Sequence, residues 1–331
     1  MIGFASWRLA EAIPSMNENL RVALKAAQLY YENDLTQDEI AQKLRLSRPK
    51  VSRLLQEARD AGLVKITVAA LPGSHTDLER QLERHYNLLD VLVVEVSQPG
   101  SYVQTARELG MAAAGYFRRI VQDGDTIGLT WGLTLASMVD NLTPEKKRHV
   151  RVTQLVGGLG EPDSEAHATD LARRLAMMLE ANLQLIPAPG IVKTVEMAQM
   201  LRSEPYVAQV LEQINQVNLA FAGIGAPNHD SLMMRDERIL TWEEIQPILD
   251  LGAVGDIGLH FYDVHGNVLE SEVEQRLIGA STDHYRQIDR VVGVAGGRDK
   301  FHSILGVVRA RLINTLITDV DTAQRLMAEA N

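Results

Sequence analysis

Residues 36–55 constrain the fold of this chain more than any other stretch. Their pattern predicts two short helices joined by a tight turn. Thr36 and Glu39 have the spacing of a capping box at the start of the first helix. Ser47 stands at the cap of the second helix, and Pro49 falls in its first turn, where a missing N–H costs little. The pair predicts a helix-turn-helix.

The second predicted helix has a basic face. Val51, Leu54 and Leu55 recur at helical spacing and are expected to face a core, which leaves the other side chains for solvent. The chain as a whole has a formal net charge of -10, so a locally basic module indicates a DNA footprint. An ordinary helical hairpin is the alternative. Arg45 stands at the turn position where a helix-turn-helix often has glycine. We predict that DNA is contacted by Ser47, Arg48, Lys50, Ser52 and Arg53.

Composition limits the class of protein. A length of 331 residues favours two or three domains, and 46% hydrophobic with 23% charged residues is typical of a globular chain with a real core. Zero cysteines exclude disulfides and thiolate metal sites. Zero cysteines also fit a reducing cytoplasm, which is the expected location. No apolar run is long enough to span a bilayer, so no membrane partner is expected.

Four segments are expected along the chain. The first lacks the order of a signal peptide and is expected to be a loose extension, with Met16 as a candidate start. The second is the helix-turn-helix domain, to which a helix over 18–31 and a short strand over 63–68 are assigned. The third is a linker, centred on 71–74, with a linking helix, and the fourth is a large effector-binding and oligomerisation domain. Their bounds are 1–17, 18–70, 71–88 and 89–331.

From residue 90 onward, short β-rich runs alternate with helices. This alternation predicts a mostly parallel sheet covered on both faces, so the fold class is α/β: a three-helix N-terminal domain plus a C-terminal α/β sandwich. The expected strands are near 91–96, 126–130, 150–156, 183–186 and 217–221, with later apolar runs at 257–262, 291–295 and 314–319. Ligands of such sheets bind beyond the carboxyl ends of the strands.

Glycine-rich turns follow several of these predicted strands. Glycines allow a backbone to approach a ligand closely, and a following helix N-terminus favours an anion. Asp256 can accept hydrogen bonds from sugar hydroxyls, and Lys300 can bind phosphate. Plain strand-to-helix turns, and a surface salt bridge between Asp256 and Lys300, are the alternatives. The turns, at 128–134, 154–160, 221–226, 252–257 and 293–300, together predict a polyol-phosphate pocket.

Nucleophilic and metal-dependent catalysis fit this sequence poorly. The nine histidines are scattered, without the spacing of a zinc site, and His167, His260 and His302 are expected to be surface or packing residues. We therefore expect no catalytic residue, no metal and no cofactor.

With these features in place, the chain resembles the SorC family of bacterial sugar-responsive transcription regulators. The resemblance covers residues 20–330 in order. It is carried by Leu-Tyr-Tyr at 29–31, the run 35–55, Thr-Trp-Gly at 130–132, Gly-Gly at 157–158, Pro-Ala-Pro at 187–189, Gly-Ile-Gly at 223–225, Gly-Ala-Val-Gly-Asp-Ile at 252–257, Val-Ala-Gly-Gly at 294–297 with Lys300, and Thr-Asp at 318–319.

The resemblance implies a function. The large domain would share the sheet of ribose-5-phosphate isomerase and glucosamine-6-phosphate deaminase without their catalysis. A phosphorylated sugar would gate a homo-oligomer, a tetramer or dimer of dimers, on a palindromic double-stranded DNA operator. The implied effector-binding residues are Thr130, Gly132, Thr134, Gly157, Gly158, Asp256, Gly296, Gly297 and Lys300.

Two positions depart from the family pattern. Some relatives have a lysine that can form a Schiff base just before the paired glycines; here that residue is Val156, so non-covalent binding is expected. Many relatives have glycine two residues after the isoleucine that follows the aspartate, whereas this chain has Gly258 one position early and Leu259 in its place.

Two other functions stay open at this point. One is an active sugar-phosphate isomerase or deaminase with an incidental helical N-terminus. The other is a σ-factor-like DNA-binding protein whose C-terminal half only oligomerises. The sequence leaves open the effector's identity, the operator, and whether the protein represses or activates.

Overall fold

The computed structural model describes residues 18–65, 74–159, 168–227 and 239–330. The chain divides into two compact units, Met1–Ala69 and Ala70–Asn331, and each is described by itself. Within the described ranges, no helix combines the length and apolar character that crossing a bilayer would require. Residues 71–73 of the linker predicted over 71–74, residues 66–68 of the strand predicted over 63–68, and His167 lie outside these ranges.

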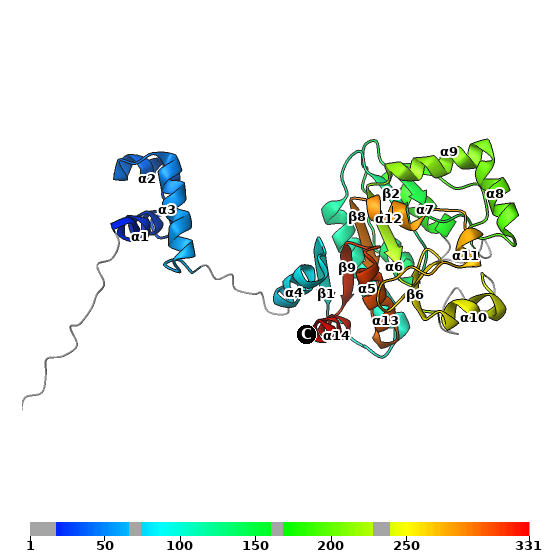
Figure 1. Cartoon of the computed structure of the whole chain (residues 1–331). Coiled ribbons are helices and arrows are strands. Elements are labelled where there is room, and N and C mark those ends of the chain that lie inside the picture. The colour runs from blue at the N-terminus through cyan, green and yellow to red at the C-terminus, as the bar shows by residue number, and fades with distance from the viewer. Residues whose placement is uncertain (1–17, 66–73, 160–167, 228–238, 331) are drawn as a thin grey trace, which may run out of the picture. The chain divides into compact units, whose positions relative to one another are not determined.

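The smaller unit contains three helices around one core (Figure 1). They are α1 (Glu18–Tyr31), α2 (Gln37–Leu44) and α3 (Arg48–Asp60). The predicted capping box is present, since Thr36 N donates to Glu39 Oε2 at 2.8 Å and Glu39 N donates to Thr36 Oγ1 at 3.3 Å. Arg45 adopts φ 52, so the turn tolerates a side chain in the left-handed region. Ser47 is the N-cap of α3 without a side-chain cap hydrogen bond, and residues 63–65 are not a strand.

The larger unit is built on seven parallel strands in the order β1-β9-β8-β5-β2-β3-β4 (Figure 1). This confirms the predicted α/β fold class with a mostly parallel sheet. The strands are β1 (Asp90–Val94), β2 (Thr126–Leu129), β3 (Arg151–Gln154), β4 (Asn182–Gln184), β5 (Leu219–Gly223), β8 (Arg290–Val294) and β9 (Thr315–Asp319).

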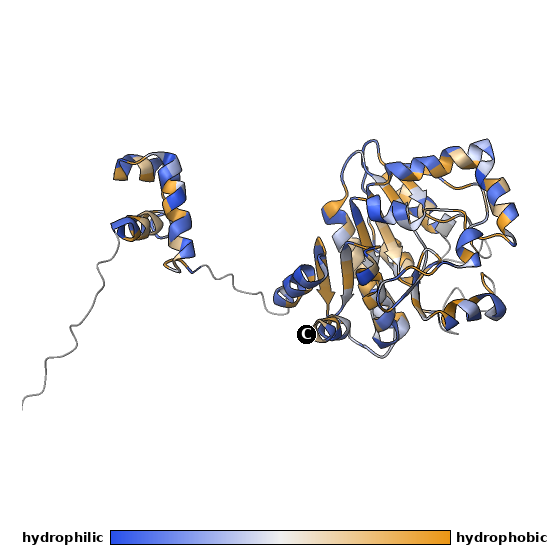
Figure 2. Cartoon of the chain, viewed as in Figure 1, coloured by the Kyte–Doolittle hydropathy of each residue, from blue (hydrophilic) through white to orange (hydrophobic). Residues whose placement is uncertain are grey.

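Helices cover both faces of this sheet, because side chains of a strand point alternately to either face. In β5, Leu219 and Phe221 join one hydrophobic core, while Ala220 and Ala222 join the other. Figure 2 shows the strands as hydrophobic and the helices as striped with hydrophilic outer faces. The helices are α4 (Thr76–Tyr86), α5 (Tyr102–Ile120), α6 (Leu133–Asp140), α7 (Ala168–Leu179), α8 (Val195–Ser203), α9 (Pro205–Gln213), α10 (Trp242–Asp250), α11 (Glu272–Gln275), α12 (Thr282–Gln287), α13 (Phe301–Ala310) and α14 (Val320–Glu329), with 3-10 turns η1 (Ile214–Gln216) and η3 (Arg298–Lys300).

The apolar run at 257–262 is the main correction to the predicted sheet. It covers the turn and most of the second strand of a separate antiparallel hairpin, formed by β6 (Ala253–Ile257) and β7 (His260–Asp263). Gly258 and Leu259 have φ values of 60 and 68, which fits a two-residue hairpin turn that needs positive φ at both positions. An apolar run alone does not distinguish a buried strand from a turn whose leucine packs inward.

Helix α4, expected as a linking helix, packs on the larger unit. Glu83 Oε1 accepts from Val91 N at 3.1 Å, and Glu79 Oε1 accepts from Val93 N at 2.9 Å. Tyr86 donates its hydroxyl to the Leu326 carbonyl at 2.8 Å. Figure 1 shows α4 beside β1 and α14, so this helix is part of the larger unit.

Candidate functional site

A cavity of about 170 Å³ opens beyond the carboxyl ends of three adjacent strands, β2, β5 and β8. Its size suits a small ligand rather than a macromolecule. This is where ligands bind in open parallel sheets. The cavity, called the effector pocket here, is lined by Tyr102, Thr130, Trp131, Gly132, Leu133, Thr134, Leu135, Gly223, Ile224, Gly225, Ala226, Asp256, Gly258, Val294, Asp299 and Lys300.

The turn from β2 into α6 forms one wall. Thr130 Oγ1 accepts from Gly223 N at 2.9 Å, which ties this turn to the end of β5. Gly132 is the N-cap of α6 with φ 130, and no side chain caps the helix. The first backbone N–H groups of α6 are therefore available to the pocket, where the positive end of the helix dipole favours an anion.

Asp256 lies on β6, not at an end of the parallel sheet. It is 4% exposed, and its Oδ2 accepts from Leu259 N at 3.1 Å. Burial raises the pKa of its carboxyl, while the Leu259 N–H and the charges of Lys300 and His260 oppose that shift. Gly225 lies directly against it, since a Cβ there would come within 1.8 Å of Asp256 Oδ1. A surface salt bridge therefore does not describe Asp256.

Lys300 ends η3, which follows β8, and so enters the pocket from the sheet side. Its Nζ donates to the Ile224 carbonyl at 2.6 Å and lies 5.4 Å from the centre of the Tyr102 ring. Part of its side chain is exposed, but the ammonium group is enclosed, and this burial lowers the pKa of Lys300 to about 8 against the opposing attraction of Asp256. The pocket thus brings one cation and one buried carboxyl together.

Five of the nine predicted effector residues line this pocket: Thr130, Gly132, Thr134, Asp256 and Lys300. The other four are turn glycines whose backbone groups bond to, or pack against, neighbouring segments. Gly157 N donates to the Ile278 carbonyl and Gly158 N donates to the Ala188 carbonyl. Gly297 N donates to Asp319 Oδ2 at 2.6 Å, and a Cβ on Gly296 would meet the same oxygen at 2.2 Å. These turn glycines shape the loops, and their contact with an effector stays a prediction.

Several lining residues were not predicted. Tyr102 begins α5 after β1, and Asp299 lies in η3 before Lys300. Nothing local in the sequence marks Tyr102, whereas Asp299 lies inside the predicted turn over 293–300. Trp131 and Gly225 lie inside the predicted turns at 128–134 and 221–226. Only the tertiary structure shows that Gly225 approaches the Asp256 carboxylate closely.

The departure at Gly258 and Leu259 has a structural explanation. Leu259, where the family resemblance leads one to expect glycine, adopts a left-handed backbone with φ 68. Its side chain is 0% exposed and joins a core with Val156 and Phe261. Gly258 cannot be larger without displacement, because a Cβ there would lie 2.5 Å from the Tyr285 hydroxyl. Burial of the Leu259 side chain thus offsets the backbone strain of its left-handed conformation next to the pocket.

The predicted DNA-contacting side chains lie on the surface of the smaller unit. Ser47, Arg48, Ser52 and Arg53 are exposed, and Lys50 is half-buried. Arg48 Nε lies 3.8 Å from Asp38 Oδ2, an exposed pair that salt screens. Opposite them, Val51, Leu54 and Leu55 are buried, as the helical spacing predicts. Their contact with DNA stays a prediction.

Comparison with known proteins gives matches to both units. The sugar-binding domain family (Sugar-bind) matches residues 72–328, and the MarR family matches residues 27–71. The deoxyribonucleoside regulator of Bacillus subtilis is 32% identical over 94% of this chain and 98% of its own length. The erythritol catabolism regulatory protein EryD of Brucella abortus is 29% identical over 94% of this chain and 97% of its own length.

A solved structure of similar organisation is the full-length sorbitol operon regulator SorC from Klebsiella pneumoniae. It has a TM-score of 0.71 and 28% identity, and the match covers 94% of this chain and 100% of that chain. These relatives are regulators rather than enzymes, so the isomerase or deaminase alternative is not supported. The chain belongs to the SorC family of sugar-binding transcriptional regulators.

Proposed function

We propose that this protein controls a carbohydrate operon, and that a phosphorylated sugar, held non-covalently in the effector pocket, sets its affinity for DNA. The observation that carries the proposal is the convergence of three groups on one cavity: the uncapped start of α6, Lys300 and Asp256. An anion site and a hydroxyl site side by side match the two ends of a sugar phosphate.

The phosphate is assigned to the α6 end of the pocket. Free N–H groups of the first helical turn, with the helix dipole behind them, bind phosphate without any specialised side chain. The Thr134 hydroxyl lies in this turn, and the Lys300 ammonium adds a full positive charge. Ile224 accepts one of the three donors of Lys300, which leaves two for phosphate oxygens.

The sugar hydroxyls are assigned to Asp256. A carboxylate only accepts hydrogen bonds, so it selects a partner rich in O–H donors. Trp131 and Tyr102, which also line the cavity, offer apolar surface to the C–H faces of a sugar. The names of the relatives mention sorbitol, erythritol and deoxyribonucleosides, and a polyol or sugar ligand fits that set.

Two positions support non-covalent binding. Val156 stands where the family resemblance places, in some members, a lysine that can form a Schiff base, and it is 0% exposed in an apolar core. Lys300 is the lysine in the pocket, and with its pKa at about 8 it stays largely protonated at neutral pH. An ammonium group binds phosphate but does not attack a carbonyl.

The DNA end of the proposal uses α3. Its exposed residues Arg48, Ser52 and Arg53 enter the major groove of a palindromic operator, with Ser47 and Lys50 at the backbone. A palindrome requires at least two copies, and we propose a tetramer or dimer of dimers in the cytoplasm, where the chromosome lies.

A thermal-shift panel tests the ligand class. Aldose, ketose and alditol phosphates are compared with inorganic phosphate and with each unphosphorylated parent. A specific ligand at a hundred times its Kd stabilises by about 2.7 kcal/mol, which raises the midpoint by several degrees. Lys300→Met should abolish the shift, while the matched change at exposed Lys193, Lys193→Met, should leave it.

The same ligand is then titrated against an operator selected from random duplexes, with fluorescence anisotropy as the readout. We expect it to change operator affinity in the wild type and not in Lys300→Met. Equal stabilisation by phosphorylated and unphosphorylated sugars would remove phosphate from the proposal. A ligand that binds without altering operator affinity would contradict the gating.

A further inference from the structure

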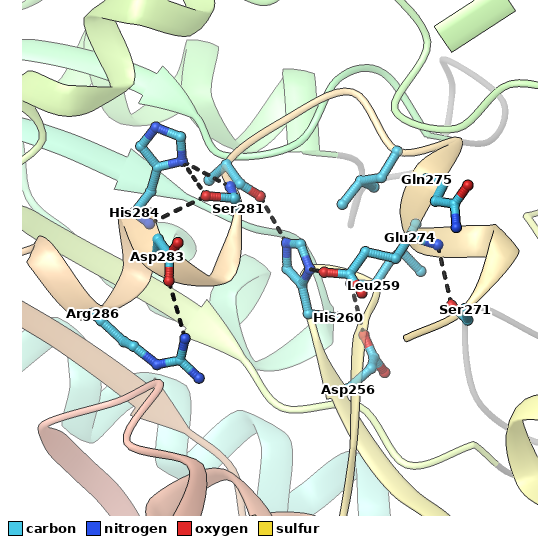
Figure 3. Close-up of polar contacts among 12 residues, drawn as sticks. Asp256, Leu259, His260, Ser271, Glu274, Gln275, Ser281, Asp283, His284 and Arg286 are labelled. Carbon is cyan, nitrogen blue, oxygen red and sulfur yellow. Dashed lines mark hydrogen bonds and ion pairs between the residues drawn. The ribbon is translucent and has the colours of Figure 1, made fainter. Parts of the chain in front are cut away.

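His260 is a buried histidine at the start of β7, just behind the pocket wall, and the pocket itself does not use it. It is 2% exposed. Its Nε2 lies 2.7 Å from the Ala280 carbonyl, and its Nδ1 lies 3.3 Å from Glu274 Oε1 (Figure 3). Both ring nitrogens therefore face oxygen atoms.

Hydrogen-bond accounting fixes one proton on this ring and requires a second one between the ring and Glu274. A carbonyl oxygen can only accept, so Nε2 must carry a hydrogen and donate it to Ala280. In a neutral ring Nδ1 would then present a lone pair to the Glu274 carboxylate, which is repulsive. A second proton between Nδ1 and Glu274 removes that conflict, and it makes the site an imidazolium beside a carboxylate.

The neighbouring histidine provides a contrast. His284 Nδ1 accepts from Ser281 N at 2.9 Å, so it must be free of a proton (Figure 3). Burial lowers the pKa of His284; Asp283 opposes that shift, and the charge of His260 adds to it. Of these two rings, His260 is the one arranged to carry a positive charge.

Asp256 lies within reach of this charge. His260 immediately follows Leu259, whose N–H holds Asp256 Oδ2 at 3.1 Å (Figure 3). The attraction of His260 and of Lys300 both lower the pKa of Asp256 against its burial. Charges act strongly over several ångströms where little water intervenes, as around a 4% exposed carboxyl. Tyr285 packs edge-on against His260, with its ring centre 5.9 Å from that of His260.

We infer that His260 and Glu274 hold a buried proton that keeps Asp256 in its carboxylate form, which makes His260 a positioning residue of the effector pocket. A carboxylate accepts from sugar hydroxyls at both oxygens, whereas a protonated carboxyl does not. The consequence for ligand binding rests on the proposed function, but the electrostatic arrangement does not.

A carboxyl titration of the full chain without ligand tests this inference. The Asp256 resonance is followed by carbon-13 NMR from acid to neutral pH, and it is identified by its loss in Asp256→Asn. His260→Gln and Glu274→Gln each remove the paired charge, the second because an amide can donate to Nδ1 and leave the ring neutral. In both variants the Asp256 midpoint should rise by about one pH unit.

His85→Gln is the matched control, since His85 is exposed on α4, and it should leave the Asp256 midpoint where it is. If His260→Gln does not fold, Glu274→Gln carries the test, because it preserves the histidine and its bond to Ala280. An unchanged Asp256 midpoint in a folded variant would overturn the inference. Because the titration is done without ligand, its result does not depend on whether a sugar phosphate binds.

Discussion

Leu259 offers a quantitative test of how packing and backbone strain are balanced at the pocket wall. The residue has φ 68 and its side chain is fully buried. Leu259→Ala removes the side chain and keeps the strain, at a cost of about 3–4 kcal/mol. Leu259→Gly also relieves the left-handed strain of about 1–2 kcal/mol, but glycine loses about 0.5–1 kcal/mol more chain entropy on folding.

The net expectation is that Leu259→Gly destabilises the protein by about 2–3 kcal/mol, less than Leu259→Ala by about 0.5–1 kcal/mol. For a unit of this size the glycine variant should melt roughly 5–10 °C below the wild type. Urea and thermal unfolding at one protein concentration measure both variants, and Leu251→Ala, at a leucine that is 59% exposed, is the control. An alanine variant as stable as the glycine variant, or more so, would refute the strain reasoning.

Four further outcomes are expected. The double change Arg48→Ala and Arg53→Ala should weaken operator binding by about 1–3 kcal/mol for each arginine that reads a base edge, and unchanged anisotropy in a folded variant would contradict the assignment. Binding of a sugar phosphate should be strongest between about pH 6, where the phosphate becomes doubly charged, and the pKa of Lys300, about 8, above which that cation is lost; calorimetry that shows tighter binding at pH 9 would contradict this sign. Thr36→Ala should destabilise the smaller unit by about 1 kcal/mol through loss of the capping box, which thermal unfolding followed by circular dichroism would measure. Residues 76–331 alone should unfold cooperatively and keep the ligand shift, because α4 packs on the sheet; an insoluble fragment would place the boundary elsewhere.

The features that could be predicted from sequence were those with local causes. The capping box of Thr36 and Glu39 acts over three residues, and the inward face of α3 follows from helical spacing, so both could be predicted. The alternation of strands and helices indicated the sheet for the same reason. Asp256 and Lys300 were placed together because glycine turns mark close backbone approach, although β6 proved to lie outside the parallel sheet.

The remainder depends on contacts between distant residues. Gly296 and Gly297 have the pattern of a ligand turn, but Asp319 on another strand occupies the Gly297 N–H. Tyr102 and Glu274 gain their significance only from neighbours far along the chain. No local spacing indicates that a histidine faces two oxygen atoms.

The two glutamates of α4 also bear on self-association. Strand β1 pairs with β9 on one side. On the other side, Glu83 accepts a hydrogen bond from Val91 N and Glu79 accepts one from Val93 N. Unoccupied N–H groups on an apolar edge strand recruit the strands of other molecules. A chain that begins at residue 89 would therefore expose the edge strand Asp-Val-Leu-Val-Val to pairing with strands of other molecules. By covering this edge, α4 also keeps the sheets of separate copies from joining edge to edge.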